Sequence, residues 1–304
     1  MENKCIMKVE NLTKVFTSGI IAGEKTLAVK DVSFKMDQGK VISLIGESGS
    51  GKTTIGRLIL KLLKPTEGKL YYNGQDITDI NSKREKKAYY KKVQAIFQDP
   101  FSSFNPLFRI DRIFNMLFNS FMKDVKDRES MIEEALESVN LNPKRILNKF
   151  PHQLSGGQLQ RLLIARALLL EVDILIADEL ISMLDASTRI GVLNLLVELC
   201  KKNGMTVLFI THDLNLGYYI SDITLIMYKG RLVEKGDTKS IYENPVHPYT
   251  QMLFESIPEI GNRWDKNVEF LPETVINDVK QFYKTNTGQG FKEVEPEHMV
   301  LFSE

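Results

Sequence analysis

The sequence predicts an α/β protein in which helices cover both faces of a mainly parallel sheet. Short apolar bursts rich in β-branched residues precede Gly46 and predict strands. After Leu154, helical patterns alternate with buried apolar strands, which is typical of parallel sheets. Between Pro106 and Phe150 the pattern is helical and largely free of strand signals. A helical subdomain is therefore expected to interrupt the sheet.

The N-terminal part is expected to form an antiparallel β subdomain and the first strand of the main sheet. The stretches "IMKVENLTKVF" and "TLAVKDVSFKMDQGKVISLIG" predict several strands. The pattern "TIGRLILKLLKP" has helical spacing from Thr54 and stops at Pro65, because proline cannot continue a helix. The segment "GKLYYNGQDIT" then predicts a short hairpin.

The rest of the chain divides into an insert, a returning α/β alternation and an extension. The helical insert is expected over about residues 100–158. The alternation follows in "LQRLLIARALLL", "DILIADE", "TRIGVLNLLVELCKKNG" and "TVLFITHD". From residue 239 to 304 there are more prolines and weaker periodicity, typical of an appendage. The predicted domains are therefore residues 1–238 and 239–304.

Composition excludes several classes of protein. Lys and Arg total 40 against 39 acidic residues, so the net charge of +1 gives no electrostatic reason to expect a nucleic-acid partner. Only Cys5 and Cys200 are present, which argues against a disulfide framework. The start has no apolar core of signal-peptide length, and no apolar run approaches the about 18 residues that span a bilayer. We expect a chain that is cytosolic or held at a membrane by other proteins.

A glycine-rich segment matches the phosphate-binding pattern G-x-x-x-x-G-K-[ST]. It follows the apolar strand "VISLI" and opens a helix, which is the context that this motif requires. Its backbone N–H groups can converge on phosphate oxygens, its lysine adds a positive charge and its threonine hydroxyl can bind Mg²⁺. The alternative is a glycine turn without a ligand. The P-loop NTPase (RecA-like) fold is predicted from these residues: Gly46, Glu47, Ser48, Gly49, Ser50, Gly51, Lys52 and Thr53, with Thr54 next in the helix.

Two further strands end in residues that suit phosphoryl transfer. The strand in "DILIADE" delivers Asp178 and Glu179 at its carboxyl end, where ligands bind in such sheets. Asp178 is expected to hold Mg²⁺ through water, and Glu179 to act as the general base for the attacking water. The strand in "TVLFITHD" ends at His212, which could hydrogen-bond the γ-phosphate. The alternatives are a solvated acidic turn and a structural histidine.

Gln98 closes another apolar strand, in "VQAIFQDP", just before the helical insert. A glutamine can offer its carbonyl oxygen to Mg²⁺ and its amide to water. A surface turn leading into Pro100 explains the same residues equally well. Both interpretations stay open at this stage.

The segment "LSGGQ" places paired glycines directly before a strongly helical run. It is either a plain loop or a phosphate cradle at a helix N-terminus, where the dipole favours an anion. Together with the phosphate loop, "IFQDP", "ILIADE" and "THD", in that order along the chain, it resembles the ATP-binding subunit of ABC transporters from about residue 6 to 236. We call Ser155, Gly156, Gly157 and Gln158 the signature segment.

The resemblance implies a site shared by two subunits. In that family two ATPase subunits sandwich two ATP molecules head to tail, so the signature segment would bind the γ-phosphate held on the opposing subunit. Phe16 matches the aromatic position that stacks on adenine, and Asp185 matches the loop that couples the two sites. Gln98 would sense both Mg²⁺ and the transmembrane partner. In this reading the signature segment is half of a site.

One departure from the family pattern follows the catalytic glutamate. The family usually has E-P-T-S-A-L-D, whereas this chain has "ELISMLD" from Glu179 to Asp185. Glu179, Ser182 and Asp185 are retained, so we expect the chemistry to be retained. Leu180 and Ile181 replace proline and threonine, which bears on the geometry of the dimer face and on the turnover rate.

A finer resemblance points to the oligopeptide and dipeptide importer branch, with nickel importers close by. It is carried by "IFQDPFSSFNP", "FPHQLSGGQ" and "NPVHPYTQMLFESIP". Many members of this branch bind an iron–sulfur cluster through cysteines in the C-terminal extension. This chain has no cysteine after Cys200, so no iron–sulfur cluster is expected. The ending "GFKEVEPEHMVLF" resembles that extension and indicates that its fold is retained without the metal.

The resemblance implies an ATP hydrolase that uses ATP and Mg²⁺ at the cytoplasmic face of the cell membrane, as a peripheral subunit. Its expected partners are a second ABC ATPase subunit in a heterodimer, two transmembrane permease subunits and, indirectly, an extracellular substrate-binding protein. A nickel or metal-complex importer is the alternative cargo class. A non-transport ABC ATPase acting on DNA or ribosomes is a further alternative, but the single set of motifs and the compact insert do not favour it.

Overall fold

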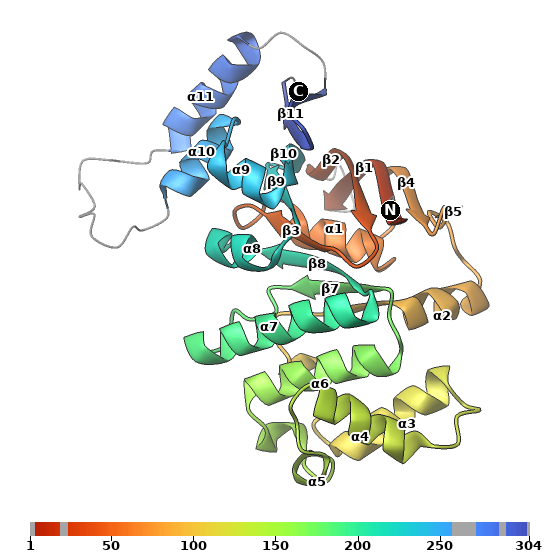
Figure 1. The fold of residues 1–304 in the computed structure, drawn as a ribbon. Coiled ribbons are helices and arrows are strands. Elements are labelled where there is room, and N and C mark those ends of the chain that lie inside the picture. The colour runs from red at the N-terminus through yellow and green to blue at the C-terminus, as the bar shows by residue number, and fades with distance from the viewer. Residues whose placement is uncertain (1–3, 19–23, 257–271, 286–289, 303–304) are drawn as a thin grey trace.

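The computed structural model describes residues 4–18, 24–256, 272–285 and 290–302. Two sheets and their helices form the body of the molecule, and a helical subdomain lies at one end of it (Figure 1). Within the described ranges no helix is long and apolar enough to cross a membrane. The fold is the predicted α/β class with an antiparallel β subdomain.

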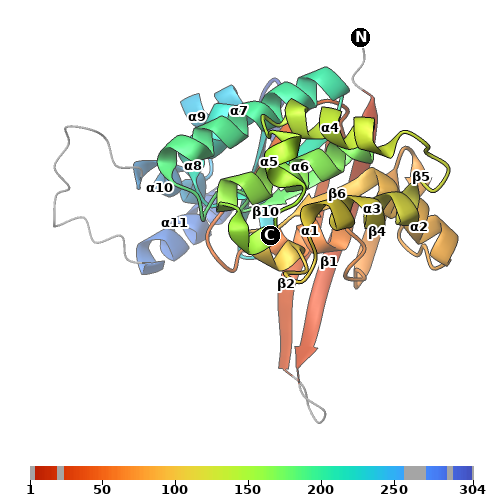
Figure 2. The ribbon, with the colours of Figure 1, turned by 90° about the horizontal axis from the view of Figure 1, so that it is seen from below.

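The smaller sheet is antiparallel and confirms the expected N-terminal β subdomain. Its strands pair in the order β2–β1–β4–β5, and the short β4–β5 pair is the predicted hairpin. Figure 2 shows β1 and β2 projecting from the body as a two-stranded ribbon. The strands are β1 (Cys5–Ser18), β2 (Glu24–Asp37), β4 (Glu67–Tyr72) and β5 (Gln75–Asp76).

The larger sheet carries the parallel strands in the order β9–β3–β8–β7–β6. Three antiparallel strands, β10, β12 and β11, continue it beyond β9. All carboxyl ends of the parallel strands therefore lie along one edge. The bounds are β3 (Val41–Ile45), β6 (Val93–Ile96), β7 (Ile174–Asp178), β8 (Thr206–Thr211), β9 (Ile223–Tyr228), β10 (Arg231–Asp237), β11 (Phe291–Glu295) and β12 (His298–Leu301).

Successive residues of the buried strands face opposite layers. Ile174 and Ile176 of β7 pack in the cluster that contains α1 (Lys52–Ile59) and the antiparallel sheet. Leu175 and Ala177 pack on the other side, against the helices that follow the insert. This alternation explains why the strand is apolar throughout, because both of its faces are covered.

Helix α1 is shorter than predicted. The sequence predicted a helix from Thr54 to Pro65, but α1 begins at Lys52 and ends at Ile59. The chain turns at Lys61, which has a φ of 57°, so the helix stops before the proline is reached. Beyond Ile59, Leu60 is buried and Leu63 packs against the same core, whereas Leu62 is exposed.

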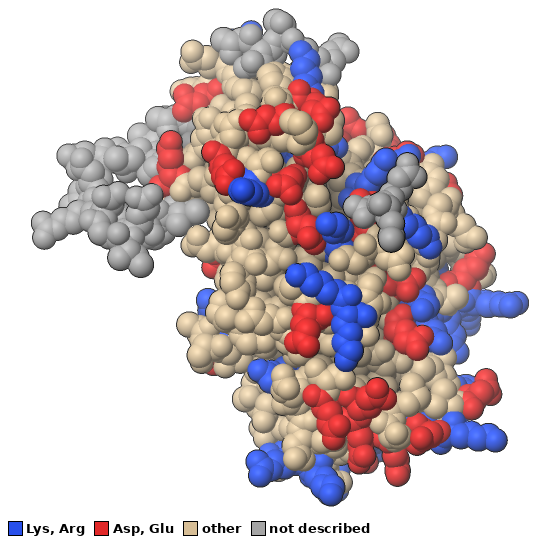
Figure 3. Space-filling model, in the orientation of Figure 1, with Lys and Arg blue, Asp and Glu red and all other residues tan. Residues whose placement is uncertain are grey.

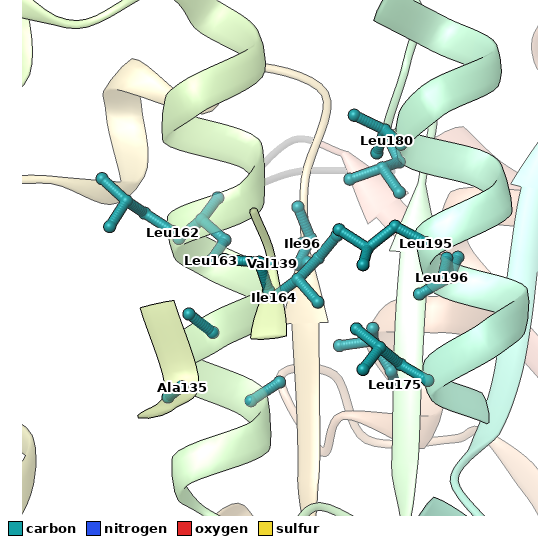
Figure 4. Close-up of a cluster of buried hydrophobic side chains, with 14 of the residues drawn as sticks. Ile96, Ala135, Val139, Leu162, Leu163, Ile164, Leu175, Leu180, Leu195 and Leu196 are labelled. Atoms are coloured by element: carbon teal, nitrogen blue, oxygen red, sulfur yellow. The ribbon is translucent and has the colours of Figure 1, made fainter. Parts of the chain in front are cut away.

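The insert is helical, as predicted, and forms the lower part of Figure 1. Figure 4 shows side chains of α6 and α7 meeting Ile96 and Leu175 of the sheet, so the subdomain shares a core with the main sheet. The helices from α2 to α8 are α2 (Lys83–Lys92), α3 (Ile110–Phe121), α4 (Arg128–Ser138), α5 (Pro143–Ile146), α6 (Gly156–Leu169), α7 (Ala186–Asn203) and α8 (Leu214–Ile220), with 3₁₀ turns at Phe101–Ser103 and Pro151–Gln153.

The C-terminal extension continues the main sheet. It comprises α9 (Thr238–Glu243), α10 (Pro248–Glu255), α11 (Pro272–Thr285) and the β11–β12 hairpin. Strand β12 pairs with β10, so the extension is hydrogen-bonded to the ATPase domain. The sequence indicated an appendage and did not reveal this pairing. The proposed boundary at residue 239 falls at the start of α9.

The surface carries both signs of charge. Lys and Arg lie among Asp and Glu over the face shown in Figure 3. This distribution agrees with the near-neutral net charge of +1. That face therefore has no single-sign field of the kind that attracts a polyanion.

Acid is expected to destabilise the extension through His247, which is fully buried. Its Nδ1 accepts the Tyr249 N–H at 3.2 Å, and its Nε2 lies 3.3 Å from the Tyr283 hydroxyl. Burial lowers the pKa of His247 from 6.5 to about 3. Between these values the unfolded chain binds a proton that the folded chain does not, so stability falls as the pH falls.

The expected loss is about 2 kcal/mol of unfolding free energy between pH 7 and pH 5. Denaturant unfolding of the wild type and His247→Asn at both pH values measures it. Asparagine keeps an acceptor for the Tyr249 N–H but does not titrate, so this variant should lose less stability on acidification by about that amount. An equal loss in both proteins would contradict the assignment to His247.

Candidate functional site

The phosphate loop, residues 46–53, connects the end of β3 to α1, as the motif predicted. Gly49 has a φ of 81°, which glycine adopts without the steric cost of a side chain. No heavy atom lies within 4 Å of the place where its Cβ would be, so the loop is open there. The first N–H groups of α1 have no acceptor within the helix and suit an anion. The loop therefore fits a bound polyphosphate.

Lys52 holds its positive charge inside this loop. Its Nζ donates to the carbonyl oxygens of Gly46 and Glu47, each at 2.7 Å. Burial lowers the pKa of Lys52, and the carboxylates of Glu179 and Asp178 oppose that shift. Lys52 is only 6% exposed, so its charge acts in a poorly hydrated environment.

Thr53, in the first turn of α1, and Asp178, at the end of β7, bring two side-chain oxygens together. The Thr53 hydroxyl donates to Asp178 Oδ1 at 3.3 Å, although the two residues are far apart in sequence. Burial raises the pKa of Asp178, and the Thr53 hydrogen bond opposes this. Hydroxyl and carboxylate oxygens suit Mg²⁺, whose charge would favour the ionised carboxylate. The pair therefore fits the predicted metal position.

Glu179 and His212 meet at the ends of β7 and β8. His212 Nδ1 lies 3.1 Å from Glu179 Oε1. A carboxylate only accepts hydrogen bonds, so this contact places a proton on Nδ1. Glu179 has a φ of 51° and donates its N–H to the Ile210 carbonyl at 2.9 Å. A non-glycine residue pays about 1–2 kcal/mol for that conformation, which is a common feature of functional positions.

Gln98 lies at the same edge of the sheet, just beyond β6. Strand β6 pairs in parallel with β7, and Ile96 is opposite Ala177. The side chain is exposed, and Asp99 accepts the Phe101 N–H at 2.9 Å as the chain turns into the insert. The structure thus contains the surface turn and also places Gln98 next to the strand of Asp178. Its role at Mg²⁺ stays a prediction.

The signature segment caps α6. Gln158 N–H donates to Ser155 Oγ at 3.3 Å, and Ser155 N–H donates to Gln158 Oε1 at 3.0 Å. A Cβ on Gly157 would come within 2.6 Å of Thr188 Cγ2, so this glycine allows α6 to approach α7 closely. Ser155 itself is exposed. Gly157 therefore serves the packing of α6 on α7, and the phosphate cradle stays a prediction.

Leu180 and Ile181 belong to the core. They are 0% and 3% exposed, and the Gln160 side chain donates to the Leu180 carbonyl. Figure 4 shows Leu180 beside the side chains of α7. The departure from the family pattern thus extends the apolar core, and neither side chain is presented on the surface.

Asp185 and Phe16 are both exposed, and their predicted roles stay predictions. Asp185 caps α7 by accepting the Thr188 N–H at 3.0 Å. Hydrogen bonds from the Ser187 hydroxyl and Thr188 lower the pKa of Asp185. Phe16 is 38% exposed near the end of β1, with Lys14 Nζ 5.3 Å from its ring centre. An exposed aromatic ring suits stacking on a base.

The structure brings only some of the predicted residues together. The phosphate loop, Asp178, Glu179 and His212 meet at adjacent strand ends. Across the described ranges, no hydrogen bond or ion pair links the signature segment to the phosphate loop. In the described part of the chain these two parts of the predicted nucleotide site are therefore not joined by hydrogen bonds.

Sequence reasoning missed a contact between the phosphate loop and the C-terminal extension. The Glu47 N–H donates to the hydroxyl of Tyr249, on α10 of the C-terminal extension, at 3.0 Å. No local pattern links residues so distant in sequence. Tyr249 lies in the "HPYT" stretch, which contributed to the family resemblance, but the sequence assigned no role to this tyrosine.

Residues 29–182 match the family model described as ABC transporter, and they contain the phosphate loop, the signature segment and the acidic pair. The chain belongs to this family. The ABC match is followed, over residues 233–292, by a match to the model described as oligopeptide/dipeptide transporter, C-terminal region. The C-terminal extension is therefore a recognised part of this branch, as the sequence predicted.

Relatives in the ABC family cover most of the chain. The oligopeptide transport ATP-binding protein OppF of Bacillus subtilis is 40% identical over 286 residues, which are 91% of this chain and 90% of the relative. The dipeptide transport ATP-binding protein DppF of Haemophilus influenzae is 38% identical over 265 residues, 86% and 80% of the two chains.

A solved ABC cassette has the same fold. The dimeric ATP-binding cassette in a post-hydrolysis state, bound to ADP and Pi, superposes with a TM-score of 0.68 at 30% identity. The similarity covers 77% of this chain and 99% of that one. These findings confirm the predicted fold class and ATP hydrolase activity. The individual roles of the site residues stay predictions.

Proposed function

We propose that this ABC ATPase couples ATP hydrolysis to the import of oligopeptides or dipeptides. One observation carries the proposal. The residues proposed to hydrolyse ATP lie together at the edge of the main sheet, and the peptide-transporter C-terminal region is hydrogen-bonded to that same sheet. OppF and DppF are named for oligopeptide and dipeptide transport, which supports this cargo class.

Hydrolysis is proposed to use the residues at the edge of the sheet. The phosphate loop binds the ATP phosphates, and Lys52 compensates their charge. Thr53 and Asp178, with Gln98, would hold Mg²⁺, which neutralises the charge that develops on the phosphate oxygens. Glu179 accepts a proton from the attacking water. At the same time the water oxygen bonds to the γ-phosphorus, and the bond between the γ-phosphorus and the bridging oxygen breaks.

His212 is proposed to bind the γ-phosphate. In the present arrangement Nδ1 donates to Glu179, so neutral Nε2 can only accept a hydrogen bond. A contact from Nε2 to phosphate therefore requires the imidazolium form or a turned ring. Formation of the active site should thus change the Glu179–His212 contact.

The site is proposed to be completed by a second ATPase subunit. Among the described residues the signature segment forms no hydrogen bond or ion pair with the phosphate loop of its own chain, and the cassette with ADP and Pi is dimeric. Phe16 would stack on adenine, and Asp185 would couple the two sites. The pair would act on two permease subunits at the cytoplasmic face of the membrane, and a heterodimer is the proposed form.

The cargo can be tested on the assembled transporter. The affinity-tagged chain is purified in detergent from its own cells, and the co-purifying subunits and the partner binding protein are identified by mass spectrometry. We expect a second ATPase, two permeases and a binding protein that carries peptides. A binding protein loaded with nickel or a metal complex, at stoichiometric metal content, would contradict the peptide assignment.

A further inference from the structure

A buried side chain of the C-terminal extension contacts the phosphate loop. Tyr249 of α10 is fully buried, and its hydroxyl accepts the Glu47 N–H at 3.0 Å. Its ring packs on Tyr228 at the end of β9, with ring centres 4.2 Å apart. A Cβ on Gly46 would collide with the carbonyl oxygen of Met227, so the first residue of the loop lies against this same strand end.

This contact fixes a peptide unit that also holds Lys52. The Glu47 N–H and the Gly46 carbonyl belong to one planar peptide. Tyr249 binds the N–H of that peptide, and Lys52 Nζ binds its carbonyl oxygen at 2.7 Å. Rotation of the peptide would therefore break both hydrogen bonds together. The loop has several glycines with positive φ, so its backbone gains from an external constraint.

Other buried polar groups hold Tyr249 in place. Glu234 of β10 accepts the N–H groups of Val246 and His247, at 3.0 and 3.1 Å, just before α10. The same carboxylate accepts His298 Nε2 of β12 at 2.6 Å. His247 Nδ1 in turn accepts the Tyr249 N–H. A continuous chain of hydrogen bonds thus runs from the C-terminal hairpin to α10.

We propose that Tyr249 is a positioning residue of the phosphate loop, through which the C-terminal extension strengthens nucleotide binding. It acts on Lys52 through the Gly46–Glu47 peptide and does not contact the nucleotide itself. The inference rests on the proposed role of the phosphate loop.

The test compares two tyrosine variants of the full-length chain. Tyr249→Phe removes only the hydroxyl at the loop. Tyr89→Phe is the matched control, because Tyr89 is also buried and its hydroxyl donates to the Ile59 carbonyl at 2.6 Å, at the far end of α1. Calorimetric titration with Mg²⁺–ADP should give about three- to tenfold weaker binding for Tyr249→Phe. Tyr89→Phe should bind ADP like the wild type.

Thermal unfolding of both variants separates affinity from stability. Each variant loses one buried hydrogen bond, so both midpoints should fall by a few degrees at most. Wild-type ADP affinity in Tyr249→Phe, or an equal loss of affinity in Tyr89→Phe, would overturn the proposal.

Hydrogen exchange gives a second readout that a purely structural role would not produce. Because coupling between two sites is reciprocal, ADP should slow exchange of the α10 amides in the wild type. The protection should be smaller in Tyr249→Phe. Equal protection of α10 in both proteins would refute the coupling.

A third variant, Lys52→Ala, distinguishes a failure of this inference from a failure of the proposed function. That variant should lose ADP binding by about 100-fold or more if the loop holds the phosphates. Impaired Lys52→Ala beside unaffected Tyr249→Phe would refute the positioning role alone. Normal ADP binding by Lys52→Ala would refute the loop assignment, and the positioning role with it.

Discussion

Glu179→Gln is expected to reduce steady ATP turnover by about 10²- to 10⁴-fold without loss of ATP binding. The amide is nearly isosteric with the carboxylate but cannot accept the proton of the attacking water. The turn should persist, because the Glu179 backbone binds the Ile210 carbonyl and the Ser182 N–H. ATP should then accumulate in a closed subunit pair.

Both effects can be measured on the Glu179→Gln protein with its partner ATPase in Mg²⁺–ATP. Phosphate release reports the turnover, and size-exclusion chromatography reports the closed subunit pair. Glu171→Gln is a matched control, since Glu171 is exposed and has almost the same φ, 50° against 51°. It should hydrolyse ATP like the wild type. Normal hydrolysis by Glu179→Gln would show that another group is the base.

Ser155→Arg is expected to stop turnover, by about 100-fold or more, while the isolated chain binds ATP with unchanged affinity. Ser155 is exposed at the start of α6, and within the described residues it forms no hydrogen bond with the phosphate loop of its own chain. A long cation there would block the phosphate of the opposing subunit. Binding to the intact phosphate loop would not be affected.

The substitution also removes a helix cap, which costs about 0.5–2 kcal/mol. Ser82→Arg controls for this loss, because exposed Ser82 caps α2 by accepting the Glu85 N–H at 3.1 Å. Both variants should lose similar stability, measured by thermal unfolding, but only Ser155→Arg should lose phosphate release. Full activity of Ser155→Arg would mean that the signature segment does not meet nucleotide.

The site could be predicted largely because its residues end adjacent strands. Glycine and lysine spacing identified the phosphate loop, and apolar strands ending in Asp178 or His212 indicated where ligands gather. The structure then places these strand ends side by side. The local sequence was enough to locate these strand ends, because the end of an apolar strand can be recognised without knowing which strand pairs with it.

Long-range contacts could not be predicted. Nothing in the sequence near β12 specifies its pairing with β10, because register is set by the whole buried face. The hydrogen bond between Glu47 and Tyr249 joins segments that are adjacent only after the sheet is complete. Leu180 is a further case, since its burial depends on the helices that cover β7.

The most direct test of the shared site is a cryo-electron microscopy structure of the purified transporter that carries Glu179→Gln, with Mg²⁺–ATP. We predict ATP on the phosphate loop of this chain, closed by the signature segment of the partner ATPase. Ser155 and Gln158 should lie against the γ-phosphate bound to that partner. ATP enclosed by one chain alone, with the signature segment in solvent, would contradict the account.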